Sequence, residues 1–132
     1  MVDNRDGLVA LVDDDPAVLD SLKFLLEVIG CRVATYASAR EFLDGRAKEA
    51  TCLIVDQHMP GMTGLELAQK LRDDGTSLPL LLMTGSPSPS IVARAALLGI
   101  DGVLEKPPDE DDLLKFVNAH LRPGPGSPHA GA

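Results

Sequence analysis

The stretch LVALVDDDP (residues 8–16) decides the fold, because an apolar run of strand length leads directly into a cluster of carboxylates. The apolar part does not alternate with polar residues, which is typical of a strand covered on both faces of a parallel sheet. Like charges repel, so clustered acids at the end of such a strand need a compensating positive charge. Asp15 precedes Pro16, a pair that predicts a helix N-cap and a proline at the first helical position. Asp13 and Asp14 have no such structural role, and we interpret them as candidate metal ligands.

Apolar runs of strand length alternate with helical patterns along the rest of the chain. The second run is more mixed than the others, so we expect it near an edge of the sheet. The predicted strands are residues 8–12, 31–36, 52–56, 78–84 and 102–105. Each predicted helix has its own start signal: Asp15 with Pro16, Ser38 with Glu41, Thr63 with Glu66, Ser88 with Pro89, and the acids at 109–112. This alternation predicts an α/β fold with a parallel sheet and helices on both faces.

Length and composition indicate one domain. The chain has 132 residues, of which 45% are hydrophobic, and this is enough for a single sizeable core. We predict a lead-in at residues 1–7, the domain at 8–121, and a flexible tail or truncated linker at 122–132. The last segment is rich in proline, glycine and small residues and has nothing to bury.

Charge and composition argue against several classes of function. A net charge of −8 and an aromatic content of 3% disfavour direct nucleic-acid binding, which relies on basic patches and stacking rings. No apolar run approaches the roughly 20 residues of a membrane span, and the acidic N-terminus is unlike a signal peptide. Cys31 and Cys52 form neither a disulfide framework nor a metal cluster, so we expect buried thiols in a cytoplasmic protein.

Polar and charged side chains follow several of the predicted strands. Asp13 and Asp14 follow the first strand, Asp56 ends the third, Thr84 ends the fourth and Lys106 follows the fifth. Because the carboxyl ends of parallel strands meet at one edge of the sheet, these side chains should gather at one site. Carboxylate oxygens without a cysteine or histidine cluster favour Mg²⁺ as the cofactor.

The order of these motifs is more informative than any one of them. They are Asp13-Asp14, Asp56 followed by MPGMTG, Thr84-Gly85 and Lys106-Pro107. In this combination, residues 8–121 resemble the receiver domain of bacterial two-component response regulators. The resemblance implies a flavodoxin-like, doubly wound fold, in which a five-stranded parallel sheet of order 2-1-3-4-5 carries five helices on its two faces.

The resemblance also implies a phosphoacceptor and a metal site. Asp56 would accept the phosphoryl group from the phosphohistidine of a partner kinase. Asp14 and Asp56 would bind Mg²⁺ directly, together with the backbone carbonyl of His58, and Asp13 would hold the ion through water. A carboxylate among carboxylates repels a phosphoryl group, so a cation is needed to cancel that field.

Two further residues would respond to phosphorylation if the resemblance holds. Lys106 would pair with Asp56 before phosphorylation and with the phosphoryl group afterwards. The hydroxyl of Thr84 would move to hydrogen-bond a phosphoryl oxygen and draw its loop inward. The resemblance also implies a cis peptide bond between Lys106 and Pro107.

Three positions near the predicted site vary among receiver domains, and their residues in this chain affect the expected mechanism. Val103 stands where receivers often carry a tyrosine or phenylalanine, so an aromatic latch coupled to Thr84 is not expected here. His58 and Ser86 lie two residues after Asp56 and Thr84, and in the family such side chains modulate how fast water removes the phosphoryl group.

We therefore expect a phosphorylation-controlled signalling switch rather than a turnover enzyme. Its expected partners are a sensor histidine kinase or phosphotransfer protein, and a downstream protein or an output domain outside this chain. The acids at 109–112, with Arg94 and Lys115, are candidates for a homodimer formed on phosphorylation.

Two other functions remain open. One is a Mg²⁺-dependent phosphohydrolase that passes through an aspartyl phosphate, although His58 stands where such enzymes carry a second acid. The other is a receiver-like interaction module that works without phosphorylation, which the absence of an aromatic residue at Val103 would allow.

Overall fold

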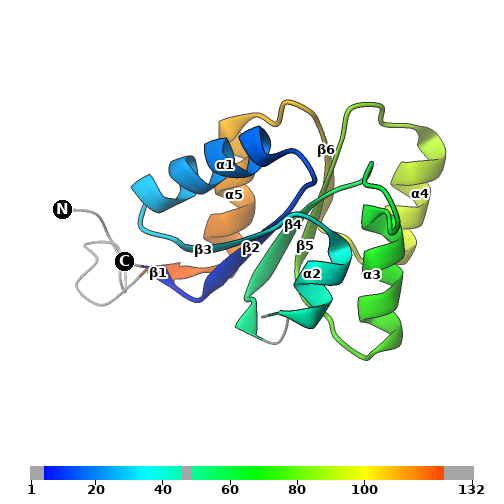
Figure 1. Ribbon diagram of the computed structural model, residues 1–132, viewed down its shortest axis with the longest axis horizontal. Helices are drawn as coiled ribbons and strands as arrows, with labels where there is room; N and C mark the ends of the chain where they lie inside the picture. The colour runs from blue at the N-terminus through cyan, green and yellow to red at the C-terminus, as the bar shows by residue number, and fades with distance from the viewer. Residues whose placement is uncertain (1–4, 46–48, 124–132) are drawn as a thin grey trace.

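A computed structural model describes residues 5–45 and 49–123, which are built around a five-stranded parallel sheet (Figure 1). The strands pair in the order β3-β2-β4-β5-β6. When these five strands are numbered 1 to 5 by their order in the chain, their order across the sheet is 2-1-3-4-5, which confirms the prediction. The mixed strand β3 lies at an edge, as expected. The strands are β2 (Leu8–Val12), β3 (Arg32–Tyr36), β4 (Cys52–Asp56), β5 (Leu80–Thr84) and β6 (Gly102–Glu105).

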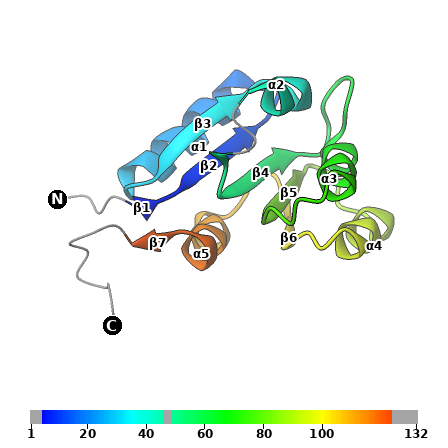
Figure 2. The same ribbon diagram turned by 90° about the horizontal axis from the view of Figure 1, so that it is seen from below.

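Helices cover both faces of the sheet (Figures 1 and 2). One face packs against α1 (Pro16–Val28) and α5 (Glu110–His120). The other packs against α2 (Ala39–Asp44), α3 (Gly64–Asp73) and α4 (Pro89–Leu97). Along β2, the side chains of Val9 and Leu11 enter the first core, and those of Ala10 and Val12 enter the second. Burial on both faces explains why this strand is apolar throughout.

The helices begin at the predicted signals. The Asp15 carboxylate accepts a hydrogen bond from the amide of Ala17 at 2.9 Å and caps α1. Thr63 and Glu66 form a reciprocal capping box at the start of α3. Gly30, with φ of 93°, follows the end of α1 in a conformation that disfavours a side chain.

Two strands are shorter than predicted. The expected strand at 31–36 begins at Arg32, and the expected strand at 78–84 begins only at Leu80. Pro79 has no amide hydrogen to donate to a ladder, although its carbonyl accepts a hydrogen bond from Leu53 at 2.9 Å. The proline therefore sets the start of β5.

Two short strands lie just outside the predicted range 8–121. β1 (Arg5–Asp6) and β7 (Arg122–Pro123) pair antiparallel with each other. Residues 1–4 of the predicted lead-in and 124–132 of the predicted tail lie outside the described residues. Within the described ranges, every helix is too short or too polar to cross a membrane.

The two cysteines belong to the core, as predicted. Cys31 and Cys52 are both buried on the face covered by α1 and α5. Burial raises the pKa of the Cys52 thiol to about 12, so this thiol stays protonated and unreactive at neutral pH.

The start of α3 rests directly on the end of β4, and Gly64 makes this approach possible. A Cβ atom at Gly64 would lie 2.7 Å from the backbone oxygen of Asp56 and 2.6 Å from the Cδ1 atom of Leu82. Neither distance leaves room for a methyl group. The glycine therefore fixes how closely α3 approaches the strand end that carries Asp56.

Gly64→Ala should lower the free energy of unfolding by about 1–3 kcal/mol, because overpacking forces backbone or side-chain shifts. Gly85 is the matched control, since a Cβ there meets nothing within 4 Å. We expect Gly85→Ala to change stability by less than about 0.5 kcal/mol. Urea denaturation of both variants measures the difference, and equal stabilities would contradict the steric role of Gly64.

Candidate functional site

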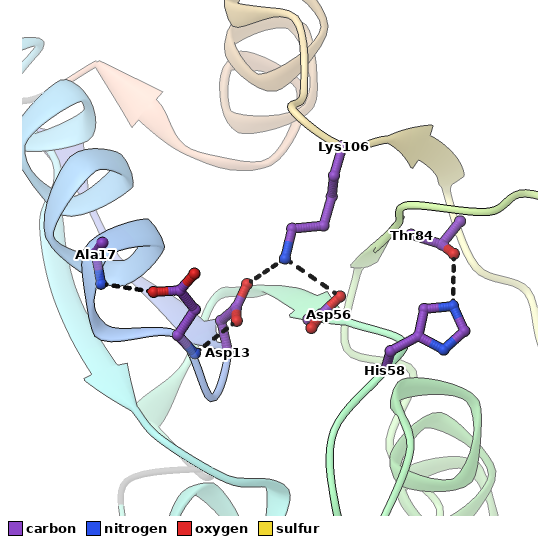
Figure 3. A network of polar contacts seen from close by, with 7 residues as sticks. Asp13, Ala17, Asp56, His58, Thr84 and Lys106 are labelled. Carbon is purple, nitrogen blue, oxygen red and sulfur yellow. Dashed lines mark hydrogen bonds and ion pairs between the residues drawn. The ribbon is translucent and has the colours of Figure 1, made fainter.

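The predicted site residues meet at the carboxyl edge of the sheet (Figure 3). Asp13 and Asp14 follow β2, Asp56 ends β4, Thr84 ends β5 and Lys106 follows β6. Asp13 is 1% exposed, Asp56 is 4% exposed and Thr84 is fully buried, whereas Asp14 is exposed. Buried carboxylates are unfavourable without charged or hydrogen-bonding partners, so these side chains define a site rather than a solvated acidic surface.

Lys106 supplies positive charge to two of the carboxylates. Its Nζ atom lies 2.9 Å from Oδ2 of Asp13 and 3.5 Å from Oδ1 of Asp56. The sequence predicted pairing with Asp56, and the structure adds a shorter contact with Asp13. The ammonium group thus lies between the two buried acids, as Figure 3 shows. The peptide bond between Lys106 and Pro107 is cis.

Backbone groups orient the Asp13 carboxylate. Its Oδ1 atom accepts a hydrogen bond from the amide of Asp15 at 2.9 Å, while Oδ2 binds Lys106. The amide of Asp13 donates to the carbonyl of Tyr36 at 3.1 Å, which ties this loop to β3. The carboxylate of Asp15 caps α1 instead, so the acids at 13–15 have different roles: Asp15 starts a helix, whereas Asp13 belongs to the site.

The surroundings shift the protonation equilibria of the central pair. Burial first, and then the negative charge of Asp13, raise the pKa of Asp56 above its ordinary value, against the opposing effect of Lys106. Burial alone would lower the pKa of Lys106, but its hydrogen bonds and charge interactions with Asp13 and Asp56 outweigh this and raise it. Lys106 therefore remains charged at neutral pH, and the site still has an excess of negative charge.

The carboxylates fit a hard divalent cation. One oxygen from each of Asp13, Asp14 and Asp56 lies within 4.8 Å of the others. An all-oxygen donor set with one exposed member suits Mg²⁺, which keeps several of its own waters. When bound, the ion would supply positive charge for the oxygens of an incoming phosphoryl group.

The hydroxyl of Thr84 has partners on two sides. Its Oγ1 atom accepts a hydrogen bond from the amide of Ser86 at 3.1 Å and lies 3.0 Å from Nε2 of His58. Val103 lies opposite Leu82 in the sheet and is partly buried against the core formed with α2, α3 and α4. This valine has no ring that could follow a movement of Thr84.

Gln57 is a positioning residue that the sequence did not reveal. It is buried directly after β4, and its side-chain oxygen accepts a hydrogen bond from the amide of Leu65 at 2.8 Å. Its own amide donates to the carbonyl of Met83 at 2.8 Å, and its carbonyl accepts from Gly64. These bonds tie β5, the end of β4 and the start of α3 together. A polar residue in a loop carries no sequence signal for such a role.

An apolar groove of about 790 Å³ opens beside the site, between α1 and the start of α5. Its lining includes Leu22, Phe24, Leu25, Val28, Lys106 and Pro107. Phe24 is 71% exposed, which is unusual for a ring of this size. The groove was not predicted, because Phe24 lies off the apolar face of α1 and gave no signal by itself.

Asp56→Asn should stabilise the unliganded domain at neutral pH. Because the pKa of Asp56 is raised, ionising this group costs more in the native state than in the unfolded chain. That cost develops as pH rises through the ordinary value of 3.8 towards the raised value, and it is constant above it. The gain from Asp56→Asn should therefore be largest at neutral pH and vanish in acid.

Urea denaturation in the presence of a chelator, at a series of pH values, measures this gain. Asp15→Asn is the control, because asparagine keeps a capping oxygen for α1 and lies outside the buried cluster. A gain from Asp56→Asn that does not change with pH would contradict the proposed cause.

Comparison with known proteins agrees with this geometry. The family model for the response regulator receiver domain matches residues 9–118. The transcriptional regulatory protein FixJ of Azorhizobium caulinodans is 40% identical over 114 residues, which are 86% of this chain and 54% of that protein. The response regulator protein TodT of Pseudomonas putida is 32% identical over 123 residues, 92% of this chain and 54% of that protein. The chain thus spans about half the length of the curated relatives it matches.

Solved structures give the same result. The chemotaxis protein CheY4 of Vibrio cholerae superposes with a TM-score of 0.79 at 30% identity, over 87% of this chain and 98% of that one. The response regulator StyR superposes with a TM-score of 0.80 at 34% identity, over 87% of this chain and 59% of that one. The strand order, the acidic site and these matches agree, and the chain belongs to the response regulator receiver domains, the phosphoacceptor signalling domains of two-component systems.

Proposed function

We propose that the chain is a phosphorylation-controlled switch in which Asp56 accepts a phosphoryl group with the help of Mg²⁺. The observation that carries this proposal is the position of Asp56. It is a buried carboxylate 3.5 Å from the ammonium group of Lys106, and it shares a cluster with the carboxylates of Asp13 and Asp14. A nucleophile, a fixed cation and ligands for a metal ion are the parts that phosphoryl transfer requires.

The transfer itself is a displacement at phosphorus. A carboxylate oxygen of Asp56 forms a bond to phosphorus while the bond from phosphorus to the donor group breaks, which leaves an acyl phosphate on Asp56. Asp13, Asp14, Asp56 and the carbonyl of His58 are the proposed holders of Mg²⁺. Lys106 balances the negative charge of the phosphoryl oxygens, and Thr84 donates its hydroxyl hydrogen to one of them.

The proposed donor is a sensor histidine kinase or a phosphotransfer protein, and the proposed location is the cytoplasm, where such donors act. The output is a changed interaction surface, read by a downstream protein, a second copy of the chain or an output domain. FixJ of Azorhizobium caulinodans is named a transcriptional regulatory protein, and this chain spans 54% of it. Any contact with DNA would therefore belong to a part of the protein outside the receiver domain.

The phosphohydrolase alternative receives less support from the site. Rapid turnover requires a group that activates water or protonates the leaving oxygen, and enzymes of this kind carry a second acid two residues after the nucleophile. His58 occupies that position in this chain, so the second acid is replaced by an imidazole. A long-lived phosphoryl adduct on Asp56 fits this arrangement better than repeated turnover does.

Incubation with acetyl phosphate and Mg²⁺ should add one phosphoryl group to the wild type, as measured by intact mass. Asp56→Asn should abolish the adduct, and so should removal of Mg²⁺ with a chelator. Asp15→Asn is the matched control, since this neighbouring acid caps α1 and should leave the adduct unchanged. Rapid hydrolysis of small phosphate esters by the wild type would favour the phosphohydrolase. If the wild type neither forms an adduct nor binds Mg²⁺, the result would favour the receiver-like module that works without phosphorylation.

The apolar groove is the proposed docking surface for the phosphodonor protein. Lys106 lines both the groove and the acidic site, so a protein bound in the groove would hold its phosphoryl group close to Asp56. The exposed ring of Phe24 would be covered by that contact, and burial of such a ring contributes roughly 1.5–3 kcal/mol. Small phosphodonors need no docking surface.

Phe24→Ala should therefore slow phosphotransfer from a histidine kinase by about tenfold or more, and it should leave the reaction with acetyl phosphate unchanged. Leu97→Ala is the control, because Leu97 is 87% exposed on α4, away from the groove. The donor to use is the kinase, from a panel of autophosphorylated kinases, that transfers fastest to the wild type. Equal effects of the two substitutions would exclude the groove as the docking surface.

A further inference from the structure

The contact between His58 and Thr84 joins an exposed side chain to a fully buried one. The imidazole of His58 lies on the surface, and its Nε2 atom is 3.0 Å from the hydroxyl of Thr84, which has no exposed area. Figure 3 shows the hydroxyl directed at the imidazole, with the carboxylate of Asp56 to one side. His58 therefore covers the switch hydroxyl from the solvent side.

The hydroxyl is held at two points in this resting position. The amide of Ser86 donates to Oγ1 of Thr84 at 3.1 Å, and the imidazole of His58 is the second partner. The Ser86 bond comes from the loop that begins α4, whereas the His58 bond comes from the loop after β4. Of these two bonds, which lie within the described residues, the His58 bond links Thr84 to the segment that carries Asp56.

We propose that His58 is a positioning residue that holds the Thr84 hydroxyl in its resting place and so favours the unphosphorylated conformation. This inference rests on the proposed function, in which the hydroxyl of Thr84 moves to a phosphoryl oxygen on Asp56. Either the imidazole or the hydroxyl can be the donor in this contact, and in both cases the hydroxyl gives up the contact when it moves to the phosphoryl group. The imidazole of His58 thus acts through Thr84, whereas the backbone carbonyl of His58 is a proposed ligand of Mg²⁺.

The size of this effect follows from the strength of one hydrogen bond. A typical hydrogen bond in a protein shifts a two-state equilibrium by roughly two- to tenfold. A ligand that binds only the released state is weakened by the same factor, because it must first shift the population. Loss of the His58 bond should therefore tighten the binding of a phosphoryl mimic by roughly two- to tenfold.

Two substitutions separate the hydrogen bond from the shape of the ring. His58→Phe keeps a flat ring over Thr84 but removes the nitrogen that meets the hydroxyl. His58→Gln carries an amide group that can reach the hydroxyl and restore a hydrogen bond. Both substitutions leave the main chain intact, including the backbone hydrogen bond of His58 that opposes the raised pKa of Asp56. His58 is exposed, so neither change disturbs the core.

The experiment is a titration with beryllofluoride in saturating Mg²⁺ at a fixed pH, followed by NMR. The reporter is the Ser86 amide, because it donates to the same hydroxyl oxygen. We expect His58→Phe to bind the mimic roughly two- to tenfold more tightly than the wild type, and His58→Gln to bind it like the wild type. In the unliganded His58→Phe protein, the Ser86 signal should move part of the way towards its position in the liganded wild type.

A double-mutant cycle with Thr84→Val tests whether His58 acts through the hydroxyl. If it does, His58→Phe has no effect on affinity in the Thr84→Val background. An effect of unchanged size in that background would overturn the inference, since His58 would then act directly on the mimic. An unshifted Ser86 signal in unliganded His58→Phe would also overturn it. A wild type that does not respond to beryllofluoride would contradict the proposed function and, with it, the role of His58. A wild type that responds, with the same affinity for the mimic as His58→Phe, would contradict the role of His58 alone.

Discussion

The ammonium group of Lys106 lies between two buried carboxylates, and the rest of the site depends on this arrangement. Asp13 and Asp56 come from different strands and would repel each other in the low-dielectric edge of the sheet. Lys106, at 2.9 and 3.5 Å, offsets this repulsion without removing the excess of negative charge. That excess suits a divalent cation, and in the proposed function the site with both cations accepts a phosphoryl group.

The parallel sheet itself brings the residues of the site together. A parallel sheet brings the carboxyl ends of its strands to one edge, so acids, a hydroxyl and an ammonium group from distant parts of the chain become neighbours. Gly64 lets α3 reach the end of β4, and Gln57 fastens the loop between them. The hydrogen bonds of Gln57 join the end of β4 to β5 and to the start of α3, so they fix the loop after Asp56.

The surroundings of Asp56 differ on its two sides, and the difference suggests a direction for the signal. Lys106 faces the apolar groove beside α1, where a donor protein can bind. His58 and Thr84 face the loop that begins α4, through the Ser86 amide. In the proposed function, input and output therefore meet at Asp56 but use separate surfaces. The side of Asp56 that faces α4 has a valine at position 103 and an imidazole 3.0 Å from the hydroxyl of Thr84. We propose that this contact controls the position of the hydroxyl, for which the valine offers no aromatic ring.

The sequence by itself determined the α/β class, the helix starts and the side chains that gather at one edge of the sheet, because these depend on local patterns. The strand order was implied by the resemblance to receiver domains. Apolar runs without alternation identify strands covered on both faces, Asp15 before Pro16 identifies a cap, and acids at strand ends identify the functional edge. The tertiary structure alone decided the shorter contact of Lys106 with Asp13, the groove beside Phe24, the buried bonds of Gln57 and the contact between His58 and Thr84. Each of these joins residues that are remote in the chain or on different elements, and their distances depend on how helices and loops pack against the sheet, which no local pattern encodes.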